Sequence, residues 1–436
     1  MSHRLSLHML IGLAAGTLAG VTAHALFPDS GVLAGFVSYV TEPIGQLFLR
    51  LLFMLVLPLL VSALALGVAG LGDLRALGRI GLRTLACTVA FSGLAVAIGI
   101  MLVRVIQPGV GLPDEARARL LELKAAAPAA APAATAANAT GMDFLVKLVP
   151  NNPIKAMADG DMLAVMVFAL FLGIGLAAVR STPARRFEEA LQGLYEISMR
   201  LLGMVIGIAP IAVACLLFTL TARLGYGVLG LLGSYVFVVI LGLAIQQFGV
   251  YSLAVRFFAG MSPLEFFRGI RPAMLTAFST ASSNATLPTA LLVAERDLKL
   301  PPTISRFVLT VGSTANQNGT GLFEGVTVLF LAQFFGVELS LSQQITVVVI
   351  CILGGIGTAG VPAGSIPVIA MVLGMVSVPV EGIGIILGVD RLLDMCRTCV
   401  NVSGDLAVAA VVSRGGADPA AELAAARAAS ATAATE

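Results

Sequence analysis

The stretch DRLLDMCRTCVNVSGD, Asp390–Asp405, lies inside an otherwise apolar run that covers Ile383–Val412. At about 100° per residue, the polar side chains that recur along it share one face of a helix. Ionisable residues inside a membrane span are costly unless they are paired or hydrated, so this face predicts a substrate or ion pathway. An Asp394–Arg397 ion pair that serves packing alone is the other interpretation. The face consists of Asp390, Asp394, Arg397, Thr398, Asn401 and Asp405.

The whole chain has the composition of a membrane protein. Of its 436 residues, 58% are hydrophobic and 11% are charged, whereas a soluble protein carries about 25% charged residues. The formal net charge of +2 leaves no basic surface for nucleic acid, so lipid and small solutes are the expected partners. The five Cys, including the C-x-x-C pair Cys396 and Cys399, lie in apolar runs and are expected to be free thiols. All His residues (His3, His8 and His24) lie near the N-terminus, which excludes a His-based zinc site or catalytic pair in the body of the chain.

Six apolar runs before Arg271 are each long enough to cross a bilayer. Arginine-rich connections alternate with arginine-poor ones such as Asp29–Glu42, and the positive-inside rule then places both termini in the cytoplasm. We expect residues 109–141, rich in Ala and Pro, to form a mobile external loop, and residues 415–436 to form a disordered tail. The predicted spans are Leu5–Phe27, Ile44–Gly70, Thr84–Ile106, Leu163–Val179, Leu194–Leu220 and Val228–Val255.

Two later apolar segments are interrupted by small polar residues. Met274–Val293 contains TASSNAT at Thr280–Thr286, and Val347–Val378 contains GGIGTAGVPAGS at Gly354–Ser365. Irregular backbone at membrane depth is tolerated only where it is buried in protein or lines a wet cavity. Each segment therefore predicts a re-entrant hairpin with its tip at the interruption.

Each hairpin is followed by a motif of the form N-x-x-G-[T/D], at Asn316–Thr320 and at Asn401–Asp405. The first hairpin enters from the arginine-rich side and the second from the opposite side. This pattern predicts an inverted repeat of a hairpin plus a broken helix, the arrangement in which transporters bind substrate and coupling ions near the bilayer midplane.

The chemistry of the polar face has two parts. Arg397 offers a planar fork that suits a carboxylate, and Asp394, one turn earlier, can hold an ammonium group. A molecule that carries both groups and a second carboxylate is an acidic amino acid. The remaining carboxylate oxygens are expected to be bound by hydroxyls and amides of Ser282, Ser283, Thr320, Thr398 and Asn401.

A hard alkali cation requires oxygen ligands. Asp405 supplies a carboxylate, and backbone carbonyls are expected to become available where Gly312–Asn316 and Ile356–Thr358 unwind. The sequence therefore predicts cation sites beside the substrate site.

At these residues the chain resembles the dicarboxylate/amino acid:cation symporter family, which includes archaeal aspartate transporters and excitatory amino-acid transporters. The resemblance covers nearly the whole chain. The motifs that carry it are FLRLLFMLVLPLL (Phe48–Leu60), SSNATLP (Ser282–Pro288), NQNGT (Asn316–Thr320), GTAGVP (Gly357–Pro362) and the Asp390–Asp405 stretch.

The resemblance implies an all-α membrane protein with eight transmembrane helices, two re-entrant hairpins and inverted repeats. It implies a homotrimer in the plasma (inner) membrane that works by an elevator mechanism, with the second hairpin as the gate. Residues 1–260 would mainly form the trimerisation scaffold. Spans three (84–106) and six (228–255) would instead join the transport core at 261–414.

The resemblance also implies roles for individual residues. Asp394 would bind the substrate amino group, Arg397 its side-chain carboxylate, and Thr398 and Asn401 its main-chain carboxylate. Further substrate-binding residues would be Ser282, Ser283, Thr320 and Val361. One sodium site would use Asp405 with the backbone of Gly312, Asn316 and Asn401, and a second would use Thr314, Gly355, Ile356 and Thr358.

The chain departs from the family at a third sodium site. Asn318 stands where many relatives have Asp in N-M-D-G-T, and Thr88 and Phe91 stand where relatives place oxygen ligands, so that only Ser92 of that group remains. We therefore expect one or two sodium ions and no organic cofactor. A proton carried by Glu324 would replace the missing charge, unless this residue is merely hydrogen-bonded in the interior.

Other departures and alternatives concern the substrate. After GTAGVP the chain reads Ala363, Gly364, Ser365, so the glycine spacing of the second hairpin differs from that of the family. A C4-dicarboxylate:cation symporter is the main alternative, although such carriers lack the counterparts of Asp394 and Thr398. A remote alternative is an intramembrane aspartyl protease, which needs two carboxylates close enough to share a proton. An enzyme is not expected, because no catalytic motif is present.

Overall fold

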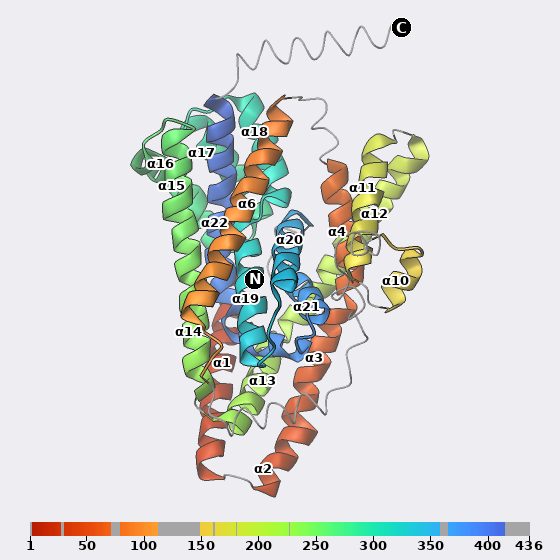
Figure 1. The fold of residues 1–436 in the computed structure, drawn as a ribbon, viewed down its shortest axis with the longest axis vertical. Coiled ribbons are helices and arrows are strands. Elements are labelled where there is room, and N and C mark those ends of the chain that lie inside the picture. Colours follow the sequence, from red (N-terminus) through yellow and green to blue (C-terminus); the bar gives the residue numbers. More distant parts are fainter. Residues whose placement is uncertain are drawn as a thin grey trace, which may run out of the picture.

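The computed structural model describes residues 2–27, 30–70, 79–111, 149–159, 162–179, 181–225, 227–357 and 365–414. Within these ranges the protein consists of helices, without a strand (Figure 1). Five of the helices are long and apolar enough to cross a membrane, or six if one bent pair counts as a single span. The predicted helical membrane fold is confirmed at this level. Most of the expected external loop 109–141 and all of the expected tail 415–436 lie outside the described residues.

The second span begins earlier than the sequence suggested. Residues of the expected outer connection Asp29–Glu42 are helical from Gly31 onward, because the Ser30 hydroxyl caps the first turn by accepting a hydrogen bond from Val32 N. The helix is interrupted at Leu55, since Pro58 has no N–H to donate to the preceding turn. The elements are α1 (Ser2–Leu26), α2 (Gly31–Phe36), η1 (Val37–Thr41), α3 (Glu42–Met54) and α4 (Val56–Gly70).

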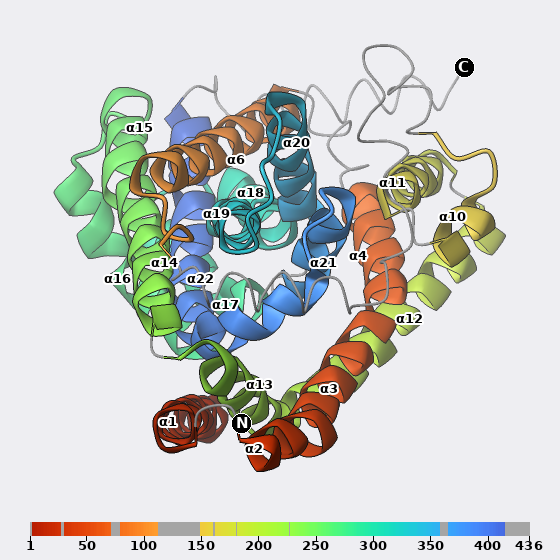
Figure 2. The ribbon, with the colours of Figure 1, turned by 60° about the horizontal axis from the view of Figure 1, so that its bottom comes forward.

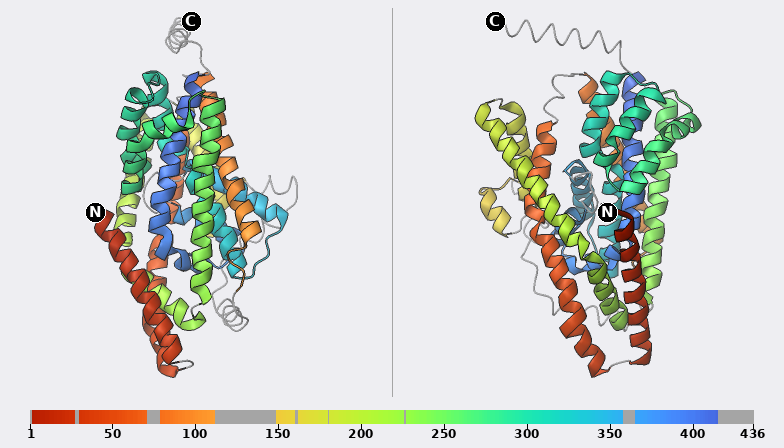
Figure 3. Two further views of the ribbon diagram at one scale, coloured as in Figure 1. Left: turned by 90° about the vertical axis from the view of Figure 1, so that its left-hand side faces the viewer. Right: turned by 180° about the vertical axis from the view of Figure 1, so that it is seen from behind.

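The expected span Leu194–Leu220 is two helices rather than one. They meet at Ile208 with a bend of 55°, because Pro210 in the first turn of the second helix cannot continue the hydrogen-bond ladder. The bent pair runs obliquely across the molecule (Figure 3). The elements of this region are α6 (Arg79–Ile106), α10 (Pro153–Asp159), α11 (Met162–Ala178), α12 (Thr182–Gly207) and α13 (Ala209–Leu224).

The sixth expected span contains a π-helical segment. It turns Gln246 and Gln247 into the protein, where the Gln247 amide donates to the Ser403 hydroxyl at 2.8 Å. Such segments place side chains that a regular helix would direct elsewhere. The elements are α14 (Gly227–Ala244), η3 (Ile245–Val250) and α15 (Tyr251–Phe257).

The segment predicted as the first hairpin forms two packed helices that meet inside the TASSNAT stretch. Ala281 ends the first helix in the left-handed region, with φ 49°, and Ser282 caps the second by accepting from Ala285 N at 3.2 Å. The second predicted hairpin also has two helices, but residues 358–364 between them are not described. The hairpin elements are α16 (Pro263–Thr280), α17 (Ser283–Arg296), α20 (Leu341–Gly357) and α21 (Ile366–Met375).

Only one of the two predicted broken helices is broken. α18 (Pro302–Ala315) and α19 (Asn318–Phe334) are separated at Asn316 and Gln317, as the motif predicted. The last helix, α22 (Ile383–Arg414), follows the short η4 (Val380–Gly382) and runs without interruption through Asn401–Asp405. The prediction of a second broken helix was wrong, because these residues keep their backbone helical and use their side chains on neighbouring elements.

The core surrounds α19, in which every residue except Gln333 is buried. α6, α14, α20 and α22 pack around this helix, as Figure 2 shows. Elsewhere α1 packs along α13, and α4 packs against α11 and α12. Spans three and six thus lie against the later elements of the chain.

Candidate functional site

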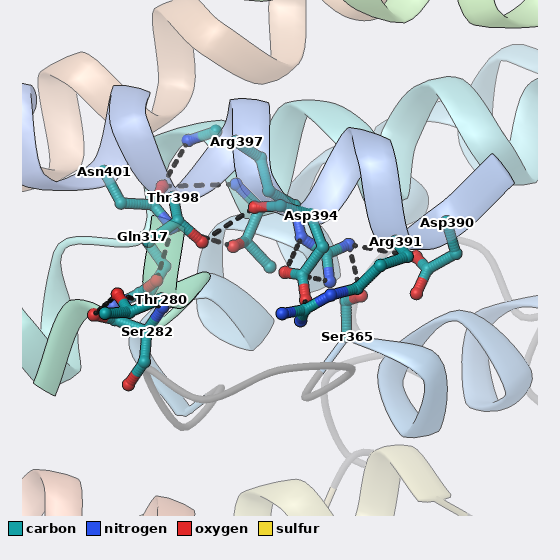
Figure 4. Close-up of polar contacts among 12 residues, drawn as sticks. Thr280, Ser282, Gln317, Ser365, Asp390, Arg391, Asp394, Arg397, Thr398 and Asn401 are labelled. Carbon is teal, nitrogen blue, oxygen red and sulfur yellow. Dashed lines mark hydrogen bonds and ion pairs between the residues drawn. The ribbon is translucent and has the colours of Figure 1, made fainter. Parts of the chain in front are cut away.

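Asp394 and Arg397 form a buried ion pair on α22. The Nε and Nη2 atoms of Arg397 each lie 2.9 Å from Asp394 Oδ1 (Figure 4). The side chains, 4% and 2% exposed, are removed from water. One helical turn therefore presents an acidic and a basic group side by side in the interior of a membrane protein, as the spacing predicted.

The rest of the Arg397 guanidinium is enclosed by other elements. Its Nη1 donates to the Ser365 hydroxyl at 2.6 Å and lies 3.6 Å from Asp390 Oδ1. The Phe323 ring of α19 lies under the guanidinium, 4.4 Å from Cζ to the ring centroid. Neither Ser365 nor Phe323 was identified as a site residue from the sequence, because both belong to segments distant in the chain.

Arg391 is a second cation at this face. Its Nη1 lies 3.6 Å from Asp394 Oδ2, and its side chain is 13% exposed. From the sequence, Arg397 was the one cation predicted on this face. A rotation of about 100° from Asp390 sets Arg391 just beyond the arc of the other polar residues, so the helical periodicity contained the signal. The carboxylate of Asp394 therefore lies between two arginines.

Asn401 joins α22 to the break between α18 and α19. Its Oδ1 accepts from the N–H of Gly319 at 2.7 Å and so caps the buried first turn of α19. Its Nδ2 donates to Gln317 Oε1 at 2.5 Å and to Thr320 Oγ1 at 3.0 Å. Thr398 directs its hydroxyl back to the Asp394 carbonyl, at 2.7 Å. The structure thus brings Thr320 and Asn401 into contact, while the Thr398 hydroxyl bonds within its own helix.

The tip of the first hairpin supplies hydroxyls. Ser282 is buried at the cap of α17, and Ser283 is 2% exposed. The Ser283 hydroxyl has no hydrogen-bond partner among the described residues. A buried hydroxyl without a partner is costly, so this group is available to a ligand.

Three residues predicted for the first cation site, Gly312, Asn316 and Asp405, lie in one close cluster. Asp405 Oδ1 accepts from Asn316 Nδ2 at 2.8 Å, while Asn316 Oδ1 is buried without a partner in the described part of the chain. A Cβ atom at Gly312 would lie 2.5 Å from Asp405 Oδ1, so only glycine permits this approach. The oxygens fit a hard monovalent cation. The predicted unwinding of Gly312–Asn316 was wrong in extent, since the helix continues to Ala315 and Asn316 N still donates to Gly312 O.

The second predicted cation set is only partly described. Thr314 is exposed, and its hydroxyl donates to the Val311 carbonyl at 3.0 Å. Gly355 and Ile356 lie near the end of α20, so the predicted unwinding of Ile356 is not found. A Cβ at Gly355 would lie 3.3 Å from the Gln317 carbonyl, which places this hairpin against the break in the preceding helix. Two predicted residues, Thr358 and Val361, lie outside the described residues.

Neutral hydrogen bonds link the residues that stand where relatives place a third sodium site. The Ser92 hydroxyl donates to Asn318 Oδ1 at 2.7 Å, and Asn318 Nδ2 donates to Tyr251 Oη at 3.0 Å. Tyr251 in turn donates to the Val400 carbonyl at 3.1 Å. This chain of donors and acceptors connects α6, α19, α15 and α22 without a charged group.

Glu324 is fully buried on α19. A Cβ at Gly354 of α20 would lie 3.2 Å from Glu324 Oε2, so the carboxyl approaches the backbone of the second hairpin. The carboxyl thus lies between the core helix and the second hairpin.

These features match one transporter family. A model of the sodium:dicarboxylate symporter family matches residues 5–415. The chain belongs to this family. It is 31% identical to the proton/sodium-glutamate symport protein of Bacillus subtilis over 94% of this chain and 92% of the relative. It is 32% identical to the proton/glutamate-aspartate symporter of Escherichia coli over 86% and 84%. It is 31% identical to the C4-dicarboxylate transport protein of Rhodospirillum rubrum over 94% and 88%.

The family match decides between the alternatives of different class. The protein is a multi-pass membrane transporter and not an enzyme. The geometry agrees, because Asp390, Asp394 and Asp405 all lie on α22, and the first two face arginines. They therefore do not form the two-helix carboxylate pair of an aspartyl protease.

Proposed function

We propose that the protein takes up an acidic amino acid, aspartate or glutamate, in symport with sodium ions, protons or both. The observation that carries this proposal is the buried contact of Asp394 with Arg397 at 2.9 Å. A cation with a planar fork and an anion on adjacent turns match a carboxylate and an ammonium group at the spacing of one small molecule. The named activities of the B. subtilis and E. coli relatives agree with this substrate class.

In the proposed binding mode, Asp394 takes the ammonium group and Arg397 the side-chain carboxylate. Thr398 and Asn401, with Thr320 from α19, would face the main-chain carboxylate. The hydroxyls of Ser282 and Ser283 would approach it from the first hairpin. Support comes from the burial of all these residues and from the unpartnered Ser283 hydroxyl.

The proposed coupling uses at most two sodium ions. Asp405 would bind the first with the backbone of Gly312, Asn316 and Asn401. The end of α20, at Gly355 and Ile356, would bind the second with the Thr314 carbonyl. The neutral bonds from Ser92 to Asn318 and Tyr251 argue against a third ion. Glu324, buried beside the second hairpin, would carry a proton.

The proposed mechanism is an elevator movement within a homotrimer in the plasma membrane. The moving unit would contain residues 261–414 with spans three and six, and the rest of 1–260 would mainly form the scaffold. Eight transmembrane helices with two hairpins and cytoplasmic termini complete this proposal. Support comes from the packing of α6 and α14 on α19 and α22.

The decisive experiment is uptake into proteoliposomes with sodium, proton and potassium gradients imposed one at a time. Labelled aspartate should accumulate only with an inward sodium or proton gradient. Liposomes without protein and proteoliposomes with equal ion concentrations on both sides are the controls. Failure of aspartate to enter or to compete under every gradient would refute the proposal.

A C4-dicarboxylate is the second candidate substrate, and the similarity to the R. rubrum carrier supports it. Succinate has two carboxylates but no ammonium group to pair with Asp394. Competition for aspartate uptake separates the candidates. Succinate should inhibit far more weakly than glutamate if Asp394 binds an ammonium group, whereas stronger inhibition by succinate would favour the dicarboxylate carrier.

A further inference from the structure

The Ser365 hydroxyl does not cap its own helix. Ser365 is the residue at the start of α21, where a serine commonly caps its own helix by accepting from a backbone N–H two or three residues later. No such bond is present here. The fully buried hydroxyl instead accepts from Arg397 Nη1 at 2.6 Å, across 32 positions of the chain.

This contact completes the partners of the guanidinium. The edge formed by Nε and Nη2 of Arg397 is held by Asp394, whereas Nη1 donates to Ser365 and lies 3.6 Å from Asp390 Oδ1. A carboxylate binds an arginine most strongly through two parallel N–H bonds. A substrate carboxylate that binds through the Nη1 hydrogen held by Ser365 therefore competes with Ser365, and one that binds through Nε and Nη2 competes with Asp394.

We propose that Ser365 is a specificity-determining residue that competes with the substrate's side-chain carboxylate for Arg397. In this proposal the hydroxyl holds Nη1 until a carboxylate of the substrate displaces it. This inference rests on the proposed substrate role of Arg397.

Competition for Arg397 changes the apparent affinity for the substrate. An interaction present only in the substrate-free state stabilises that state and lowers the apparent affinity for the substrate. A hydrogen bond to a charged group has a net strength that corresponds to about a tenfold change in affinity. Removal of the Ser365 hydroxyl should therefore strengthen aspartate binding about tenfold and destabilise the empty protein.

The test compares purified full-length variants for aspartate affinity at fixed sodium, and for melting temperature with and without saturating aspartate. Ser365→Ala and Ser365→Gly both remove the hydroxyl, and Ser365→Thr keeps one. Ser305→Ala is the matched control, because Ser305 is as buried but bonds only to backbone of its own helix region, at Pro301 and Pro302. Two hydroxyl-free variants keep the test valid if one fails to fold.

We expect the hydroxyl-free variants to bind aspartate more tightly and to lose melting temperature only without aspartate. The Thr variant should resemble the wild type, and Ser305→Ala should shift both melting temperatures equally. Unchanged or weaker binding in both hydroxyl-free variants, or tighter binding in the Thr variant as well, would overturn the role of Ser365. If the wild type binds succinate but not aspartate, the proposed function fails, and the same comparison with succinate still decides the competition.

Discussion

Asn401 of α22 caps the start of α19, because its Oδ1 accepts the Gly319 N–H at 2.7 Å. The first N–H groups of a helix have no partner within it, and in the interior of a membrane protein water is not at hand to replace one. The Asn401 side chain of α22 thus stabilises the break between α18 and α19. The same amide reaches Gln317 and Thr320, so a ligand at Asn401 acts on the broken helix as well.

Arg397→Cys should abolish binding and transport of acidic amino acids. The change removes the fork that the substrate carboxylate needs, and such buried charge contacts correspond to a loss of about a hundredfold or more. The protein should remain folded, because Arg391 still lies beside Asp394. The measurements are aspartate affinity and a monodisperse elution profile, with the surface variant Arg306→Cys as control. High-affinity aspartate binding by the Arg397→Cys variant would remove this residue from the substrate site.

Asp394→Asn should separate amino acids from dicarboxylates. The neutral amide no longer pairs with an ammonium group, so aspartate affinity should fall by about a hundredfold. Succinate lacks an ammonium group, so its affinity should fall much less. Competition curves for both ligands on the same preparation measure the difference, and equal losses would assign Asp394 a structural role.

Gly312→Ala should weaken sodium binding specifically. The added Cβ would lie 2.5 Å from Asp405 Oδ1 and must push the carboxylate out of place. Overpacking of this kind costs about 1–3 kcal/mol, or roughly tenfold or more in sodium affinity. Gly230→Ala is the matched control, since a Cβ there meets no atom within 4 Å. Equal sodium dependence of aspartate binding in both variants would place the cation elsewhere.

Sodium stoichiometry should not exceed two ions per aspartate. Asn318 is already engaged by Ser92 and Tyr251 and offers no negative charge to a third ion. Reversal potentials in proteoliposomes at several sodium ratios give the number directly. A slope that corresponds to three sodium ions would refute the argument from the neutral hydrogen bonds.

Glu324→Gln should remove any dependence of uptake on an imposed pH gradient. The amide keeps the shape of the buried side chain but cannot release a proton. Sodium-driven uptake should persist, and Glu265→Gln on the exposed part of α16 should leave both dependences intact. Proton-driven uptake that survives in the Glu324→Gln variant would exclude Glu324 as the carrier.

Local features of the sequence were sufficient to predict several parts of this molecule. The polar face of α22 was predictable because helical periodicity alone puts Asp394, Arg397 and Asn401 on one side. The tip of the first hairpin was predictable because small residues at Ala281 and Ser282 interrupt an apolar run. The break at Asn316 followed from the same kind of signal. Each depends on residues within a few positions of one another.

Tertiary structure alone decided the remaining features. The contact of Ser365 with Arg397 joins residues 32 positions apart, and the cap of Gly319 by Asn401 joins residues 82 positions apart. The N-x-x-G motif occurs in both places, yet the backbone is interrupted only between α18 and α19. Both Asn316 and Asn401 direct their side chains to another helix, but only the backbone at Asn401 stays helical. A side chain's partner depends on which elements pack together, and local sequence does not fix that packing.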